Sequence, residues 1–276
     1  TIDIPAIMGV MSALVLAFIL GIGISKVKDS SLLKVFEEFN SIVIMIVTNV
    51  LIPLVPIYIC CIFAKLSFSG EIFTTLKSFA IVYAVLFSLQ AIYILIQYSI
   101  ASVIKKENPF KLIKNMLPAY FTAMGTQSSA ATIPVTLQCV KSNNVGEEIA
   151  EFVVPLGATI HLAGDTITLV ITSMAVMYMN GQVPTLSQVI PFIFMLGVTM
   201  IAAPGVPGGG VMAALGLLET MFGFGSIEKP IMIALHAAQD SFGTATNITG
   251  DGAIAVIVDY LINKKDNESN VELESA

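Results

Sequence analysis

The chain has 276 residues, of which 56% are hydrophobic and only 12% are charged, with a mean hydropathy of +0.88 and a net charge of −6. A soluble domain is about half apolar and about a quarter charged, so this composition excludes a soluble enzyme and predicts a polytopic membrane protein. All thirteen basic residues are lysine. Because planar recognition of carboxylates and phosphates relies on the arginine guanidinium, its absence argues against a dianionic ligand and against nucleic acid.

Several apolar segments are long enough to cross about 30 Å of hydrocarbon as helices, which takes about 20 residues each. The predicted spans are 6–25, 36–64, 78–104, 147–178 and 230–262. The chain starts at Thr1 rather than at a methionine, in apolar sequence. We therefore expect it to be a piece of a longer protein.

Two further apolar stretches, about 112–140 and 188–222, are broken by clusters of proline, glycine and serine. Lysines gather at 26–34, 105–141 and 264–265, which the positive-inside rule places on the cytoplasmic side. Each broken stretch must then enter and leave the membrane on one face, and the two faces are opposite. This pattern predicts an all-α inverted-repeat transporter with two re-entrant helical hairpins.

A similarity between two segments of the chain supports the inverted repeat. Gly157–Asp165 resembles Gly243–Asp251 with three identities in nine, and each segment follows one of the broken stretches. The ionisable residues of the predicted spans also gather there. Because each of them costs at least about 2.5 kcal/mol at the bilayer centre, they are candidates for function. They are His161, Asp165, His236, Asp240 and Asp251.

The tips of the two hairpins are typical of ligand cradles. Ser128 and Ser129 precede a half-helix whose positive end favours an anion, and glycines 205 and 208–210 let the second backbone approach a ligand closely. On the last span, residues spaced three and four apart share one face. A carboxylate, a hydroxyl and an amide there suit a zwitterion with a cation beside it; the residues are Asp240, Thr244, Asn247 and Asp251.

Four motifs in order carry a resemblance: Gln127–Pro134, Pro155–Ile160, Gly205–Gly210, and Asp240 with Asn247–Asp251. In these motifs the chain resembles the dicarboxylate/amino acid:cation symporter family. Compared with the eight spans and two hairpins of that family, it lacks the first three spans and most of the fourth. The resemblance implies part of the scaffold in 1–77, a transport domain in 78–265 with both hairpins, and a cytoplasmic tail in 266–276.

The resemblance also implies the site residues. Asp240 would bind the α-ammonium group of an amino acid, while Asn247 and the Ser129 backbone hold its α-carboxylate. The substrate-binding residues carried over are Ser128, Ser129, Asp165, Val206, Gly210, Asp240, Gly243, Thr244 and Asn247. The sodium ligands carried over are Gly157, His161, Asn247 and Asp251.

The chain departs from the family at positions that concern the substrate. Gly243 stands where carriers of acidic amino acids have an arginine that grips the side-chain carboxylate, and Asp165 replaces a threonine near the substrate side chain. Since an acid replaces a hydroxyl and the guanidinium is missing, we expect a neutral or basic amino acid, not an acidic one. His161 and Ala163 replace ligands of a further sodium site, and His161 and Asp165 could instead exchange a proton.

The sequence therefore predicts a secondary active symporter that couples entry of a cation, sodium before a proton, to amino-acid uptake by alternating access. We expect a multi-pass protein of the plasma membrane with a cytoplasmic C-terminus, a homotrimer at full length, and no organic cofactor or nucleic-acid partner. The alternatives are a proton- or sodium-coupled dicarboxylate symporter, an ion channel and an intramembrane enzyme. The enzyme would need a Gly-x-Gly-Asp or His-Glu-x-x-His pattern, and the sequence has neither.

Overall fold

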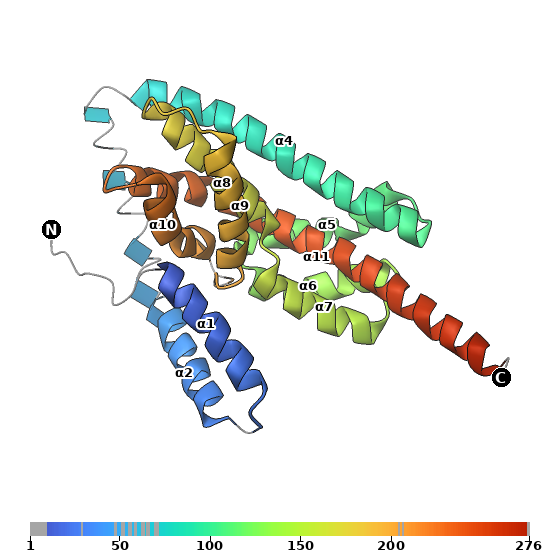
Figure 1. The fold of residues 1–276 in the computed structure, drawn as a ribbon. Helices are drawn as coiled ribbons and strands as arrows, with labels where there is room; N and C mark the ends of the chain where they lie inside the picture. Colours follow the sequence, from blue (N-terminus) through green and yellow to red (C-terminus); the bar gives the residue numbers. More distant parts are fainter. Residues whose placement is uncertain are drawn as a thin grey trace.

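The computed structural model describes residues 10–28, 30–46, 72–203, 205 and 207–274, together with 49–50, 53–54, 57, 60–61, 64 and 67–68. The regular structure of these residues is entirely helical, with no strand among them, as the sequence predicts (Figure 1). The helices are α1 Val10–Ser25, α2 Ser31–Ile46, α4 Ile72–Lys105, α5 Pro109–Thr126, α6 Ser129–Ser142, α7 Glu147–Ile160, α8 Ala163–Met179, α9 Leu186–Met200, α10 Gly209–Phe222 and α11 Glu228–Glu274.

Three segments of the described chain are long and apolar enough to cross a membrane. They are Phe79–Lys105, Glu147–Met179 and Glu228–Asn263, and they match the predicted spans 78–104, 147–178 and 230–262. Helix α1 covers most of the predicted span 6–25, whereas α2 covers only the beginning of 36–64. Most of residues 47–64 lie outside the described residues.

Each broken stretch forms a pair of helices in contact with one another: α5 with α6, called here the first pair, and α9 with α10, the second pair. Helix α5 ends because Gln127 adopts a left-handed conformation (φ 51°), and Ser128 then caps α6 by accepting from the Ala131 N–H. Gly208 (φ 75°) similarly precedes α10, a conformation that glycine adopts without strain. The entry of each pair from one membrane face remains a prediction.

The predicted span 147–178 is not one continuous helix. It is interrupted at His161 and Leu162, which have non-helical backbone angles, so that α7 and α8 are separate helices. The amide N–H of Gly164 at the start of α8 donates to the Asn247 side chain at 2.7 Å. A side chain of α11 therefore takes over one of the hydrogen bonds that a continuous helix would make within itself.

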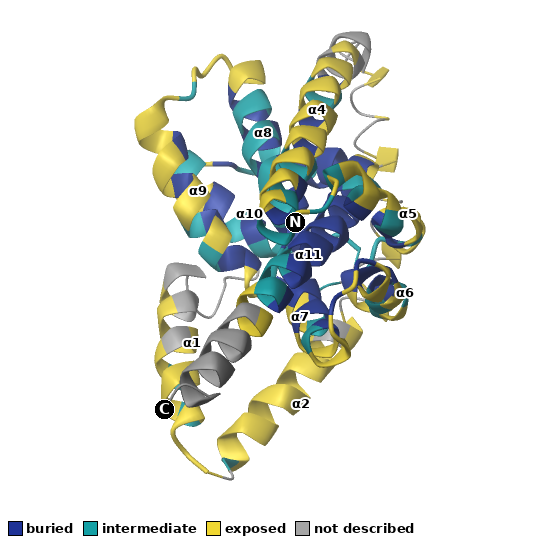
Figure 2. Cartoon of the chain, turned by 90° about the vertical axis from the view of Figure 1, so that its right-hand side faces the viewer, coloured by how far each residue is buried: buried dark blue, intermediate teal, exposed yellow. Residues whose placement is uncertain are grey.

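Helix α11 is the centre of the fold and contacts α4, α5, α6, α7, α8 and α10. Figure 1 shows it running between the other helices, and Figure 2 shows buried residues along it. Its N-terminal part shares a hydrophobic core with α8, α9 and α10. Its middle part, from Ala245 to Val256, shares a second core with α5, α6 and α7. The two helix pairs thus pack against successive parts of one helix.

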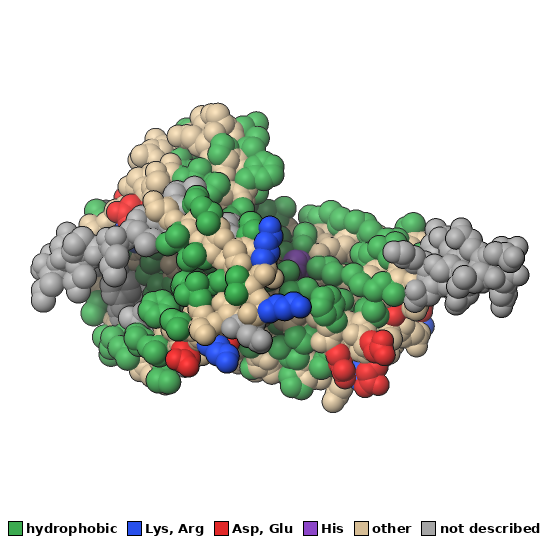
Figure 3. Space-filling model, turned by 60° about the horizontal axis from the view of Figure 1, so that its bottom comes forward, with side chains coloured by type: hydrophobic (Ala, Val, Ile, Leu, Met, Phe, Trp, Pro, Cys, Tyr) green, Lys and Arg blue, Asp and Glu red, His purple; other side chains and the backbone are tan. Residues whose placement is uncertain are grey.

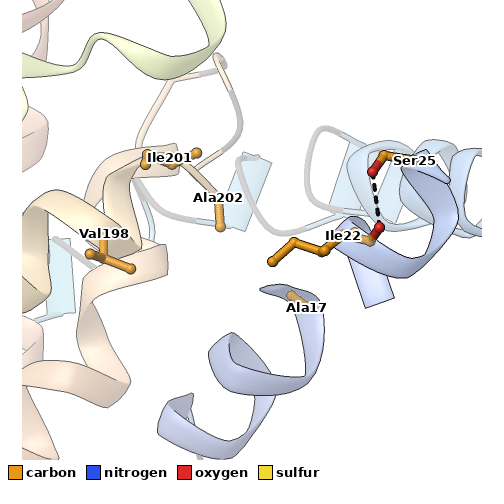
Figure 4. Close-up of a pocket in the computed structure, with 7 residues that line it drawn as sticks. Ala17, Ile22, Ser25, Val198, Ile201 and Ala202 are labelled. Atoms are coloured by element: carbon orange, nitrogen blue, oxygen red, sulfur yellow. Dashed lines mark hydrogen bonds between the residues drawn. The ribbon is translucent and has the colours of Figure 1, made fainter. Parts of the chain in front are cut away.

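The outer surface is largely apolar, as Figure 3 shows for one face, where charged side chains form only small groups. A groove of about 370 Å³ lies between α1 and the end of α9 (Figure 4). It is lined by Ala17, Gly21, Ile22, Ser25, Val198, Ile201 and Ala202. None of the predicted site residues lines this groove, so the candidate site lies elsewhere.

Candidate functional site

The loops of the two helix pairs are joined by a hydrogen bond. The Ser128 hydroxyl donates to the Gly205 carbonyl at 2.8 Å while its oxygen also caps α6. Next to it, the Gln127 amide donates to Ser241 on α11 at 2.8 Å. The loop of the first pair therefore touches both the loop of the second pair and the central helix. Serine suits this position because one hydroxyl can donate and accept at once.

Asp165 is a buried carboxylate between α8, α10 and α11, with 4% of its surface exposed. One oxygen accepts from the Asn247 amide at 2.7 Å, and the other lies 3.1 Å from the His236 Nε2 atom. Two glycines surround it. A methyl group added at Gly210 or at Gly243 would stand 3.1 Å or 3.5 Å, respectively, from Asp165 Oδ1. Without side chains at these two positions, the backbones of α10 and α11 can lie close to the carboxylate.

Asp240 lies on α11, with a carboxylate oxygen within 4.8 Å of Asp165 and His236 ligand atoms, and is also buried. Its Oδ2 atom accepts from the Gly208 N–H at 2.7 Å. Since Gly208 is the residue before α10, the donor is one of the free N–H groups around a helix start, where negative charge is favourable. Thr244, one turn further along α11, is buried as well.

Asp251 belongs to a second polar cluster, where α7, α4 and α11 meet. Its Oδ1 atom lies 2.8 Å from His161 Nδ1, and the other nitrogen of that ring lies 3.1 Å from the Tyr93 hydroxyl. Gln97 in turn donates to Tyr93 at 2.7 Å. Asp251 Oδ2 is buried and has no hydrogen-bond partner among the described residues. The oxygen that remains free is suited to a cation.

The two similar segments, Gly157–Asp165 and Gly243–Asp251, pack against one another in opposite directions. Gly157 lies against the Asp251 carboxylate, whereas Gly164 lies against the Gly243 carbonyl. The beginning of each segment therefore meets the end of the other. A side chain at Gly157 or Gly164 would collide with the partner segment, which explains the glycines at these two positions.

A family model of the sodium:dicarboxylate symporter family matches residues 4–261. The chain belongs to this family. It is 27% identical over 270 residues to an excitatory amino acid transporter of Caenorhabditis elegans, covering 96% of this chain and 53% of the relative. It is also 29% identical over 172 residues to human neutral amino acid transporter A, and 30% identical over 171 residues to human excitatory amino acid transporter 1.

Each human match covers 62% of this chain and about a third of the relative, 32% and 31% respectively. The symporter-family chain thus spans about half, or less, of the length of these curated relatives. Together with the apolar helices, family membership makes it a membrane protein of a transporter family and excludes the enzyme alternative.

The structure brings several of the predicted substrate residues of this symporter-family chain to one place. Asp165, Gly210 and Gly243 lie together, and Asn247 joins them through its hydrogen bond. Ser128 reaches the second loop instead, and the buried Ser129 follows it at the start of α6. Val206 lies outside the described residues. Of the predicted sodium residues, Gly157, His161 and Asp251 lie together, whereas the Asn247 side chain is engaged with Gly164 and Asp165.

One predicted pairing is wrong. His161 and Asp165 are not partners for proton exchange, because His161 pairs with Asp251 and Asp165 lies beside His236. The helix break at His161 and Leu162 also means that His161 and Asp165 do not lie one turn apart on a single helix. The structure separates these residues into two clusters.

Sequence reasoning missed the contribution of α4. Gln90 donates to Thr168 and to Gln239, while Tyr93 and Gln97 extend the cluster around His161. Polar residues spaced three and four apart on an otherwise apolar span lie on one helix face. That spacing was a signal that could have found them. His236 was recognised as an ionisable residue, but only the structure places it next to Asp165.

Proposed function

We propose that the intact protein is a secondary active symporter that couples sodium entry to uptake of an amino acid with a neutral or basic side chain. The chain's family is named for sodium and dicarboxylates, and its relatives are named as excitatory or neutral amino acid transporters. The transport mode is supported by these names. The choice of side chain is supported by the site.

The contact between Gly243 and Asp165 carries the proposal. Position 243 faces the Asp165 carboxylate, with space for a methyl group at ordinary contact distance. No cationic side chain of this chain neutralises the carboxylate from there, and the chain contains no arginine. A buried charge without a partner is costly, so a substrate that brings its own ammonium or guanidinium group is favoured. An acidic side chain would add a third carboxylate beside Asp165 and Asp240.

The α-ammonium and α-carboxylate groups, which all amino-acid substrates share, would replace contacts within the protein. The α-ammonium group would take the Asp240 oxygen that now accepts from Gly208. The α-carboxylate would take the Asn247 amide, now bound to Asp165, and the N–H groups at Ser129. Because the Gly208 contact belongs to the loop of the second pair, substrate binding at Asp240 and movement of this loop would be linked.

Sodium would bind at Asp251. Its free oxygen Oδ2 is buried, and Gly157 of α7 packs directly against the carboxylate. A hard cation prefers oxygen ligands, which this carboxylate and nearby carbonyls can supply. His161 occupies the other oxygen and limits the site to one side of the carboxylate.

We further propose that the two helix pairs are re-entrant hairpins whose loops close the site during alternating access. The contacts from Ser128 to Gly205 and from Gly208 to Asp240 join both loops to the central helix. The intact protein would be a homotrimer in the plasma membrane with its C-terminus in the cytoplasm. Residues 1–77 would belong to the scaffold, 78–265 to the transport domain and 266–276 to the tail.

The test is uptake by the full-length protein in proteoliposomes with an inward sodium gradient. Labelled lysine, serine, aspartate and succinate are compared, and the neutral or basic substrates are expected to be taken up. Asp165→Thr is expected to reduce uptake of lysine by more than about tenfold while serine uptake continues, because truncating one partner of a buried charge pair costs about 2–5 kcal/mol. Uptake of succinate or aspartate alone would refute the proposed specificity.

Coupling is tested in the same vesicles by replacing sodium with choline at constant pH. Uptake is expected to stop, and Asp251→Asn is expected to abolish it even with sodium present. Uptake that continues without sodium but follows an imposed proton gradient would refute sodium coupling.

A further inference from the structure

Three buried side chains on α8 and α11 present metal-ligand atoms to one another. They are Asp165, His236 and Asp240, and one ligand atom from each lies within 4.8 Å of the other two. Their exposed fractions are between 1% and 5%. The set combines two carboxylates with one imidazole, which is a donor combination found in metal centres.

The described residues supply no cation for this cluster. The lysines of the described residues that form ion pairs do so with acids outside this cluster, namely Asp259, Glu107, Glu147 and Glu219. The chain contains no arginine. Two buried carboxylates without a positive partner are unfavourable. A cation from outside the chain is therefore expected to bind between them.

His236 indicates what kind of cation this is. Neither of its ring nitrogens has a hydrogen-bond partner among the described residues, although the ring is 1% exposed. Nε2 lies 3.1 Å from Asp165 Oδ1 but outside hydrogen-bonding geometry. A free imidazole nitrogen is a good ligand for zinc, cobalt or nickel, whereas sodium, magnesium and calcium prefer oxygen.

The remaining contacts hold the two carboxylates in place. Asn247 donates to Asp165 Oδ2 and the Gly208 N–H donates to Asp240 Oδ2, which leaves one oxygen of each for a metal. Such outer hydrogen bonds orient metal ligands. The backbone of Gly210 approaches the cluster closely, because a methyl group there would stand 3.1 Å from Asp165 Oδ1 and 3.2 Å from His236 Nε2, tighter than ordinary contact.

We propose that Asp165, His236 and Asp240 form a binding site for one divalent transition-metal ion of the zinc type. Bonds of about 2 Å in a tetrahedral site separate the ligand atoms by roughly 3.3 Å, so modest rotations of these side chains would complete it. Three protein ligands leave a fourth position open. Because Asp165 and Asp240 are also assigned to the substrate, the metal excludes the amino acid; this second statement rests on the proposed function, and the metal site itself does not.

The test is a titration of the purified full-length protein in detergent with Zn²⁺, followed by calorimetry and by thermal unfolding. The three cysteines are first replaced by serine or alanine to remove thiol ligands. One Zn²⁺ per chain is expected to bind and to raise the Tm, as a ligand of the folded state does. His236→Ala is expected to weaken binding by at least about 10- to 100-fold, more than the loss of an outer hydrogen bond.

The matched control is His161→Ala, which removes the chain's other histidine and is expected to leave Zn²⁺ affinity unchanged. Gly210→Ala, which keeps all three ligands but places a methyl group against two of them, is expected to weaken binding as well. It is also the second test if His236→Ala does not fold. Equal Zn²⁺ affinity in the unsubstituted protein and in either site variant would overturn the metal site.

A competition titration separates the two proposals. Millimolar lysine or serine is expected to lower the apparent Zn²⁺ affinity, and Zn²⁺ is expected to inhibit uptake in proteoliposomes. Zinc binding that depends on His236 but is unaffected by any amino acid supports the metal site and overturns the shared pocket. Amino-acid uptake without His236-dependent zinc binding overturns the metal site and supports the proposed transport function.

Discussion

The backbone of Gly243 lies against the carboxylate of Asp165, so that a methyl group added at Gly243 would stand 3.5 Å from the Oδ1 atom. The two positions are 78 residues apart in the sequence. Because Gly243 has no side chain, it places no charged group beside the buried acid.

This contact predicts the effect of Gly243→Arg. The guanidinium group would pair with Asp165 and occupy the space of a basic substrate side chain, so lysine uptake is expected to fall by more than about tenfold. Gly243→Ala adds a methyl group at ordinary contact distance without charge and serves as the control, which should retain uptake. Combining Gly243→Arg with Asp165→Thr should produce uptake of labelled aspartate. If Gly243→Arg transports lysine as well as the control does, the assignment of Asp165 to the substrate side chain is wrong.

The close packing of α8 on α11 predicts a stability difference between two glycines. A methyl group at Gly164 would collide with the Gly243 carbonyl, which is backbone and cannot rotate away, whereas Gly197 in α9 has nothing within 4 Å. Gly164→Ala is expected to destabilise the protein by about 1–3 kcal/mol. Gly197→Ala should be neutral or stabilising by up to about 1 kcal/mol, because alanine favours a helix. Tm values in detergent compare them, and equal values would contradict this packing.

Loss of the hydroxyl that joins the two loops should affect both stability and substrate retention. Ser128→Ala removes the cap of α6, worth about 1 kcal/mol, and the hydrogen bond to Gly205. We expect a lower Tm and faster release of bound substrate, measured by filter binding. Ser142→Ala on the same helix removes only an exposed bond to the Gln138 carbonyl and should change neither. Unchanged release from Ser128→Ala would mean that the loops do not close the site.

The His161–Asp251 contact predicts a change in the sodium requirement. His161→Asn removes the imidazole that occupies Asp251 Oδ1 and leaves both carboxylate oxygens for a cation. Since a hydrogen bond to a charged group is worth about 1.5–3 kcal/mol, half-maximal uptake should need roughly tenfold less sodium. Tyr93→Phe, which removes the outer partner of His161 and the acceptor of the Gln97 amide but leaves the imidazole at Asp251, should have a smaller effect. A weaker sodium response in His161→Asn would show that the ring supports the site instead of limiting it.

The sequence was sufficient for the elements with a local cause. Apolar length identified the helices that could cross a membrane, and the breaks at Gln127 and Gly208 follow from local backbone preferences that serine, glycine and proline clusters signal. The sequence similarity between Gly157–Asp165 and Gly243–Asp251 indicated that the two segments are related. Composition alone indicated the bilayer.

The partners of the buried charges could not be predicted in the same way. Asp165 meets His236 and Asp251 meets His161 because α8 and α7 pack on different parts of α11. That packing depends on the contacts of Gly164 and Gly157 with the facing helix, which no local pattern encodes. The interruption of 147–178 also has a non-local cause, since a side chain of α11 takes the N–H at Gly164.

The central position of α11 has a consequence for how the protein is made. Chains emerge from the ribosome with the N-terminus first, so the helix that contacts most of the others is synthesised after the other described helices. Until it arrives, Asp165 lacks both His236 and Asn247, and Gln90 lacks Gln239. Until α11 is synthesised, the earlier helices therefore have unpaired polar groups in the membrane. A chain truncated before Glu228 would expose those groups to the quality-control machinery of the cell.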